Sequence, residues 1–142
     1  MLIKQISIFL PNQKGHLARV TGALLKNKID IRAMVAFDTA DFGILRAIVT
    51  EPDRALEVLK NDGFVAKISK VVVVEPEDRT GSLHEIFALL AEKGMNIDYT
   101  YSFVMRKGEM PYFVLKVDEL EQALEALTQN GIKVINKNEI NE

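Results

Sequence analysis

The chain repeats one sequence pattern. Residues of its first half recur 66 residues later, and past the middle of each copy the offset becomes 68. The two additional residues fall around positions 106–109. Because self-similarity at a fixed spacing indicates a duplicated structural unit, we expect a first repeat at residues 1–69 and a second repeat at residues 70–142. The recurring pairs include Gly15 and Gly81, Leu17 and Leu83, Ile31 and Ile97, and Gly63 and Gly131.

Each repeat shows the same order of expected elements: strand, helix, strand, strand, helix, strand. Alternating apolar residues predict the strands, and apolar residues three or four apart predict the helices. The strands expected in the first repeat are 2–10, 29–37, 42–50 and 64–68, with helices at 17–28 and from Pro52 to about the glycine at 63. Those expected in the second repeat are 71–74, 97–105, 111–117 and 132–136, with helices at 82–93 and 119–130.

This order of elements predicts the fold class. A β-α-β-β-α-β unit is the ferredoxin-like, split β-α-β arrangement. Ser69 and Lys70 alone separate the repeats, which is too short for a flexible linker. A unit of roughly 70 residues has a thin core, and pairing two units would bury more surface and remove exposed sheet edges. We therefore expect an α+β fold, with two ferredoxin-like repeats side by side in one eight-stranded antiparallel sheet and four helices on one face.

The composition excludes several classes of protein. Apolar residues make up 48% of the chain and charged residues 27%, which favours a packed core over disorder. The 18 basic and 20 acidic residues give a net charge of -2, which argues against a nucleic-acid partner. Cysteine is absent, which excludes disulfide scaffolds, thiol catalysis and thiolate metal sites. Two histidines make a metal site improbable, and we expect no cofactor.

The N-terminal residues do not have the pattern of a signal peptide, since no basic segment precedes a long apolar one. The longest apolar run, residues 71–74, is far shorter than a membrane span. We therefore expect a cytoplasmic protein without a membrane partner.

The loops around two glycines are the strongest candidates for a binding site. Each lies between a buried strand and a helix, and Asn12 and Asp78 stand three residues before Gly15 and Gly81. Glycine lets a ligand approach the backbone closely, and the free N–H groups of a helix N-terminus favour an anion such as a carboxylate. An Asn or Asp oxygen there can accept hydrogen bonds from an ammonium group. Together these groups suit the two ends of a free amino acid, although a plain turn with a helix cap is the alternative.

The pattern Asn/Asp-x-x-Gly-x-Leu, followed by a helix and by Asp30-Ile31 or Asn96-Ile97, resembles the ACT domain. The resemblance covers nearly the whole chain. It implies a regulatory module that associates side by side with another and binds an amino acid between the glycine loop of one unit and the second strand of its neighbour. The positions it implies for ligand binding are Asn12, Gly15, His16, Leu17 and Asp30 in the first repeat, and Asp78, Gly81, Ser82, Leu83 and Asn96 in the second.

The two implied sites differ in charge. Asn12 with Asn96 makes a neutral pair that matches the family well. Asp78 with Asp30 would place two carboxylates together, and these repel unless a cation or a proton intervenes. The second pair is therefore expected to prefer a ligand with additional positive charge, or to stay empty.

These observations favour a non-catalytic sensor that binds a free amino acid at the interface between two ACT repeats and modulates an enzyme of amino-acid metabolism. Unpaired sheet edges predict a homodimer or larger assembly. Two alternatives remain. One is a ligand-free structural or regulatory subunit that docks on a biosynthetic enzyme. The other is a small enzyme on a ferredoxin-like scaffold with His16 and an Asp as acid and base, which fold alone does not exclude.

Overall fold

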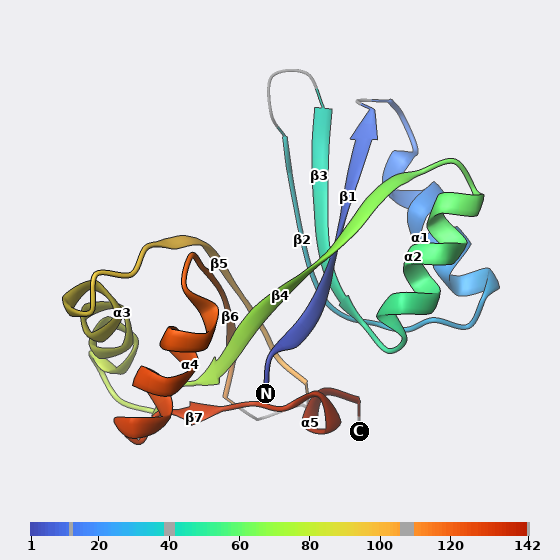
Figure 1. Ribbon diagram of the computed structural model, residues 1–142. Helices are drawn as coiled ribbons and strands as arrows, with labels where there is room; N and C mark the ends of the chain where they lie inside the picture. The colour runs from blue at the N-terminus through green and yellow to red at the C-terminus, as the bar shows by residue number, and fades with distance from the viewer. Residues whose placement is uncertain (12, 39–41, 106–109, 142) are drawn as a thin grey trace. The chain divides into compact units, whose positions relative to one another are not determined.

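The structure is a computed structural model of the chain, and it describes residues 1–11, 13–38, 42–105 and 110–141. The chain divides into two compact units, one made of residues 4–69 and the other of residues 1–3 with 70–142 (Figure 1). Each unit contains a β-α-β-β-α-β order of elements, as the sequence predicts.

In the first repeat, an antiparallel sheet with the strand order β2–β3–β1–β4 carries two helices on one face (Figure 1). Leu45 of the central strand β3 lies opposite Ile8 of β1 on one side and opposite Ala36 of β2 on the other. The elements are β1 (Ile3–Pro11), α1 (His16–Lys26), β2 (Ile31–Asp38), β3 (Phe42–Val49), α2 (Pro52–Asn61) and the beginning of β4 (Val65–Glu75).

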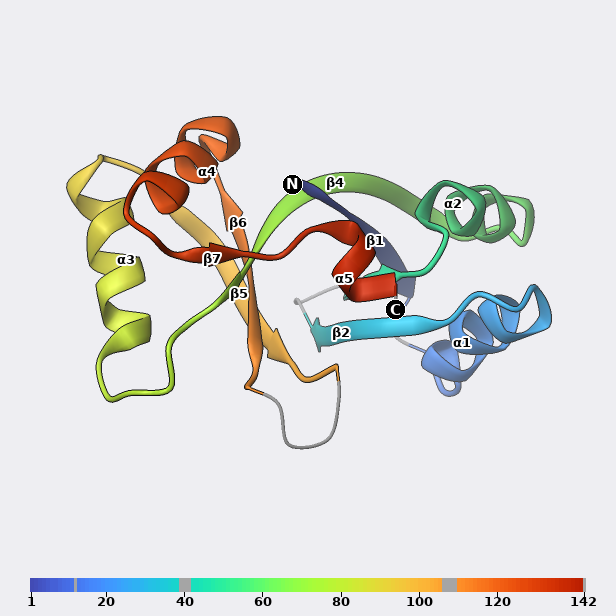
Figure 2. The same cartoon turned by 90° about the horizontal axis from the view of Figure 1, so that it is seen from below.

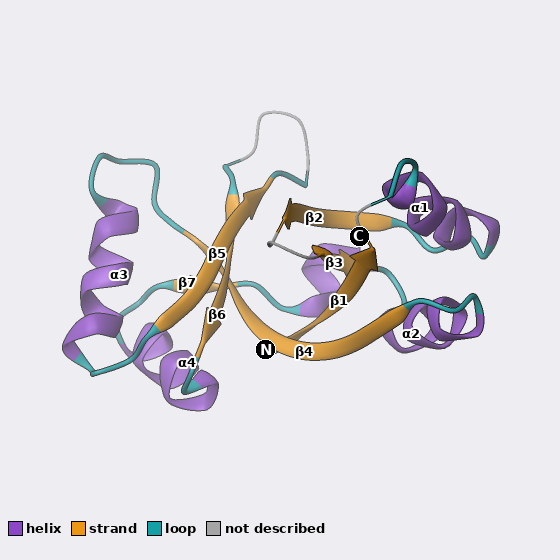
Figure 3. Ribbon diagram, turned by 90° about the horizontal axis from the view of Figure 1, so that it is seen from above, coloured by secondary structure: helices purple, strands orange, loops and turns teal. Residues whose placement is uncertain are grey.

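The second repeat has the same layout, and its helices α3 and α4 lie on the same side of β5 and β6 (Figure 3). Leu115 of β6 lies opposite Val72 of β4 and Thr100 of β5, and the short β7 pairs with the far edge of β4. The elements are the end of β4, α3 (Ser82–Glu92), β5 (Ile97–Phe103), β6 (Tyr112–Val117), α4 (Leu120–Gln129) and β7 (Lys133–Val134).

Each repeat has a core of its own between its sheet and its two helices. The alternation in β1 sends every second side chain toward the helices, where the helical apolar stripe meets it. In the first core, β1, α1 and α2 contribute Ile6, Ile8, Leu10, Val20, Leu24, Ala55 and Leu59. In the second core, β4, α3, β6 and α4 contribute Val72, Val74, Ile86, Leu90, Leu115, Val117 and Leu127. The two glycine loops are therefore each fixed at both ends by buried strand and helix residues.

The expected number of strands was wrong. Over the described residues the chain has seven strands and five helices, not eight strands and four helices. The strands expected at 64–68 and 71–74 are one continuous strand, β4, which Figure 2 shows as a single curved ribbon. Neither Ser69 nor Lys70 is a Gly, Pro or Asn that would favour a turn. The residues on both sides favour a strand, so the strand continues through this position.

The fifth helix, α5 (Lys137–Asn141), also lies outside the expected order. Its start is closed by a reciprocal capping pair: the Glu139 N–H donates to Asn136 Oδ1 at 3.1 Å, and the Asn136 N–H donates to Glu139 Oε1 at 3.4 Å. Ile140 of this helix is buried. Within the residues that the structure describes, no helix combines the length and apolar composition needed to cross a membrane.

Candidate functional site

Both glycines that the sequence selects adopt a left-handed backbone immediately before a helix. Gly15 precedes α1 with φ 78°, and Gly81 precedes α3 with φ 90°. Residues with a Cβ disfavour this region of φ, so glycine is the residue that permits the turn from strand to helix. A Cβ built on either glycine would meet no atom within 4 Å, so the backbone on that side is open to an incoming group.

The first loop (residues 11–16) is closed by two backbone hydrogen bonds. The Gln13 N–H donates to the Pro11 carbonyl at 2.8 Å, and the His16 N–H donates to the Gln13 carbonyl at 3.3 Å. His16 Nδ1 lies 2.5 Å from that same carbonyl oxygen, which accepts a hydrogen bond from the ring. One ring nitrogen of His16 is thus committed to its own loop. Asn12 lies outside the described residues.

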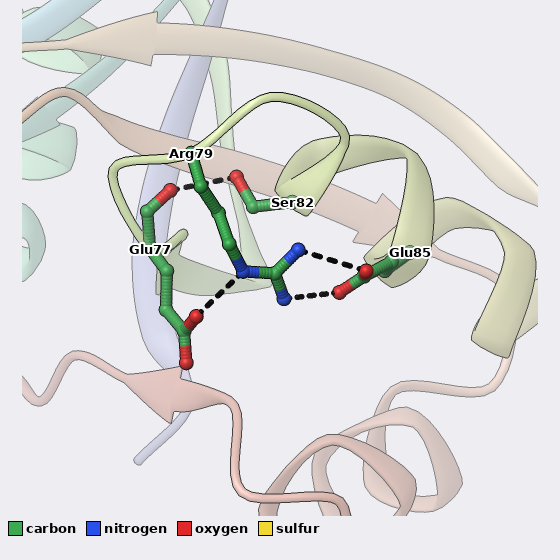
Figure 4. Close-up of polar contacts among 4 residues, drawn as sticks. All are labelled: Glu77, Arg79, Ser82 and Glu85. Atoms are coloured by element: carbon green, nitrogen blue, oxygen red, sulfur yellow. Dashed lines mark hydrogen bonds and ion pairs between the residues drawn. The ribbon is translucent and has the colours of Figure 1, made fainter.

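The second loop (residues 77–82) repeats the backbone bonds of the first. The Arg79 N–H donates to the Glu77 carbonyl at 2.9 Å, and the Ser82 N–H donates to the Arg79 carbonyl at 3.3 Å. Ser82 Oγ donates to the Glu77 carbonyl at 2.7 Å (Figure 4). Equal bonds at equal positions show that the described residues of the first loop have the same backbone bonding as their counterparts in the second. Ser82, a position that the family resemblance implies for ligand binding, here closes the loop with its hydroxyl.

Each loop also has a side-chain contact between the residue two before the glycine and the residue four after it. In the first repeat, the Arg19 guanidinium donates to Gln13 Oε1 at 3.4 Å, which is a long hydrogen bond. In the second repeat, Arg79 donates two hydrogen bonds to the Glu85 carboxylate, at 2.8 Å and 2.5 Å. Arg79 Nε donates a third to Glu77 at 2.8 Å (Figure 4).

This contact shifts the pKa values of both Arg79 and Glu85. The hydrogen bond from Arg79 lowers the pKa of Glu85, and the hydrogen bonds to Glu85 and Glu77 raise the pKa of Arg79. The side chains of Arg79 and Glu85 are 47% and 58% exposed, so solvent screens the pair and its contribution to stability is small. Its effect is to fix the guanidinium beside the loop.

The starts of the two second strands are also held alike. The Thr50 N–H donates to the Asp30 carbonyl at 3.1 Å, and the Asp30 N–H donates to Thr50 Oγ1 at 3.1 Å. In the second repeat, the Asp118 N–H donates to the Asn96 carbonyl at 3.1 Å, and the Asn96 N–H donates to Asp118 Oδ1 at 3.0 Å. Asp30 and Asn96 are therefore equivalent in structure as well as in sequence.

Their side chains have neighbours two residues further along. The Asp30 carboxylate forms an ion pair with Arg32 at 3.2 Å. Asn96 Nδ2 donates to Asp98 Oδ1 at 2.9 Å. The sequence treats Asp30 as an uncompensated acid, whereas the structure places a cation beside it. The expected pair of Asp78 and Asp30 therefore carries less net negative charge than the sequence suggests, because Arg32 offsets the charge of Asp30.

Hollows border both loops. Leu17 and His16 line a hollow of about 260 Å³ in the first repeat, at the ends of β1 and β2. In the second repeat, Asp78, Ser82 and Leu83 line a hollow of about 430 Å³. A further hollow of about 560 Å³ lies beside it, toward α3 and β7, and Arg79 lines both. The structure thus brings these loop residues together within each repeat, while Asp30 and Asn96 line none of these hollows.

Three residues at or beside the second loop were missed from the sequence: Glu77 and Arg79 of the loop, and Glu85 of α3. A signal was present, because a cation and an anion stand six residues apart around Gly81. The same spacing around Gly15 joins Gln13 to a cation. This spacing marks the positions as candidates, but it does not show that their side chains meet.

A family model described as an ACT domain pair matches residues 1–142. The chain belongs to this family. The match confirms, over the full chain, the resemblance inferred from the two glycine loops. ACT domain pairs are a regulatory, non-catalytic family.

Solved structures extend the comparison. The ACT domain pair is 32% identical to protein BT0572 from Bacteroides thetaiotaomicron, with a TM-score of 0.92 over 100% of this chain and 97% of that one. It is 23% identical to the ligand-free regulatory subunit of aspartate kinase from Thermus thermophilus, with a TM-score of 0.62 over 90% of this chain and 93% of that one. The corresponding subunit from Thermus flavus is 21% identical, with a TM-score of 0.60 over 89% and 90%. The two kinase subunits show a shared fold. A search of curated proteins found no match.

Proposed function

We propose that this ACT domain pair is a regulatory protein without catalytic activity that binds a free amino acid at its glycine loops and modulates an enzyme of amino-acid metabolism. The observation that carries the proposal is the duplicated loop: the same left-handed glycine and the same two backbone bonds precede both α1 and α3. A turn that only connects a strand to a helix does not require the same glycine conformation and the same hydrogen bonds in both repeats.

The loops supply what the carboxylate end of an amino acid needs. Within the described residues, neither α1 nor α3 has a side-chain cap, so the first-turn N–H groups that follow His16 and Ser82 remain available to an anion. In this proposal Asn12 and Asp78 accept hydrogen bonds from the ligand's ammonium, with Asn96 and Asp30 as the predicted second contributors. The remaining predicted contacts are Gly15, His16 and Leu17 in the first repeat, and Gly81, Ser82 and Leu83 in the second.

The regulated partner is proposed by analogy with the shared fold. Two structures of this fold are regulatory subunits of aspartate kinase, which supports an amino-acid metabolic enzyme as the target. A homodimer or larger assembly is also proposed, since β2 and β5 stand at the ends of the strand order, and the edge of a sheet is a place where another chain can pair. A cytoplasmic location stays a prediction from the sequence.

A ligand-free regulatory subunit is the second candidate. The observation that favours it is that two polar groups of the second loop already have internal partners: Ser82 Oγ donates to Glu77, and Arg79 is held by Glu85. In this case the protein would act on its enzyme by docking alone.

Isothermal titration calorimetry of the full chain against each of the twenty free amino acids separates the two. We expect saturable binding of at least one amino acid, with no conversion of the ligand when the mixture is analysed afterwards by mass spectrometry. Absence of binding to all twenty would refute the sensor and leave the docking subunit. Chemical conversion of a bound amino acid would instead establish an enzyme.

A further inference from the structure

The contact across the glycine loop has opposite chemistry in the two repeats. Gln13 and Arg79 stand at matching positions before the glycine, and Arg19 and Glu85 stand at matching positions after it. In the first repeat the cation meets a neutral amide at 3.4 Å. In the second repeat the cation meets a carboxylate through two short hydrogen bonds. The backbone around the contact is the same in both, so the side chains alone make the difference.

The second contact uses the part of Arg79 that would recognise a ligand. A guanidinium binds a carboxylate best when two parallel N–H groups meet its two oxygens. Nη1 and Nη2 of Arg79 make this arrangement with Glu85, and Nε is taken by Glu77 (Figure 4). Arg79 also lines the two hollows beside the loop, together with Ser82. A ligand carboxylate entering there would find the guanidinium already occupied by a carboxylate of the protein.

We propose that Glu85 is a specificity-determining residue that keeps ligands with an additional carboxylate away from the second loop. It does so by occupying Arg79 as an internal competitor. The first loop has Gln13 in place of such a competitor and accepts an acidic ligand more readily. This inference rests on the proposed amino-acid binding at the loops. Because exposed ion pairs are weak, the discrimination is about two- to fivefold and not absolute.

The inference is tested by nuclear magnetic resonance of the full, isotope-labelled chain titrated with malonate at constant ionic strength. Malonate carries two carboxylates and no ammonium group, so it probes carboxylate recognition alone. The backbone amide signals of residues 79–82 report the second loop, and those of residues 13–16 report the first. We expect Glu85→Gln to lower the malonate concentration at half-saturation of the second loop about two- to fivefold, with the first loop unchanged.

Two controls separate competition at Arg79 from the loss of one negative charge. Glu92→Gln removes an exposed carboxylate at the far end of α3 and should leave both loops as in the wild type. Arg79→Gln added to Glu85→Gln should abolish the gain. Equal effects of Glu85→Gln and Glu92→Gln, or no effect of either, would overturn the inference.

A reciprocal change tests the same idea in the first repeat. Gln13→Glu places a carboxylate opposite Arg19, and it should weaken the response of the first loop to malonate by a similar factor. An unchanged first loop in this variant also contradicts the inference. The proposed function is judged separately, by titrating the wild type with amino acids: a wild type that binds none, together with a malonate gain in Glu85→Gln, would refute the sensor while upholding competition at Arg79.

Discussion

The Asp118 carboxylate accepts a hydrogen bond from the Asn96 N–H at 3.0 Å, and the Asp118 N–H returns one to the Asn96 carbonyl at 3.1 Å. The pair joins the end of β6 to the start of β5. It fixes the backbone of a residue that the family resemblance assigns to the ligand, and Thr50 does the same for Asp30.

Replacing this acceptor should loosen the start of β5. We expect Asp118→Ala to lower the free energy of unfolding by about 1 kcal/mol, since one side-chain hydrogen bond is lost at an exposed position. Asp118→Asn keeps an acceptor oxygen and should lose about half of that or less. Urea unfolding followed by circular dichroism measures both, and equal losses in the two variants would show that the bond contributes nothing.

The left-handed glycines make a second prediction. Gly15→Ala and Gly81→Ala should each destabilise the protein by about 1–2 kcal/mol, because φ is 78° and 90° there while the added methyl meets no atom. Gly22→Ala is the matched control within α1: it also meets no atom, its φ is not positive, and alanine is the better helix former. It should stabilise the protein by up to about 1 kcal/mol. Three variants with equal unfolding midpoints would contradict the assigned backbone conformations.

The third prediction concerns pH. The hydrogen bond from Arg79 lowers the pKa of Glu85 below its ordinary value of 4.5. A lowered pKa in the folded state means that the contact stabilises the fold above about pH 4.5, and that this stabilisation is lost as the pH falls through the lowered pKa. A carbon-13 titration of the Glu85 carboxyl group should show the low value, and Arg79→Gln should return it toward 4.5. A Glu85 that titrates identically in both proteins would show that the pair does not form in solution.

The fourth prediction concerns the ligand. We expect Asn12→Ala and Asn96→Ala each to weaken the binding of an amino acid by about 1–3 kcal/mol, the cost of leaving a buried polar group of the ligand without its partner. Asn130→Ala removes an amide from the end of α4 and serves as the control. Calorimetry on the three variants, with circular dichroism to check folding, decides the matter: unchanged affinity in Asn12→Ala and Asn96→Ala would place the ligand elsewhere.

Periodicity predicted the elements well because each strand or helix buries one face. It failed at Ser69-Lys70, where two polar residues between apolar runs resemble a boundary although neither forces a turn. It also missed α5, which is only five residues long and in which Ile140 is buried. The capping pair of Asn136 and Glu139 was the readable signal there.

The two glycine turns of the candidate site could be located from the sequence because a left-handed turn restricts the residue type strongly. The contact of Arg79 with Glu85 could not, because nothing in a linear pattern states that residues six apart will meet. That proximity arises from the turn at Gly81, which brings the loop back over the first turn of α3. Single residues such as glycine thus identify where the backbone turns. Which side chains then meet depends on the three-dimensional path of the backbone after that turn.

The continuous strand β4 also restricts how the chain could have changed since its duplication. Ala66 of this strand belongs to the first core, and Val72 and Val74 belong to the second. One inserted residue between them would turn every later side chain of the strand to the opposite face and remove both valines from their core. The junction between the copies is therefore sensitive to the insertion or deletion of a single residue. The two residues by which the copies differ stand instead around positions 106–109, between β5 and β6 and outside both strands.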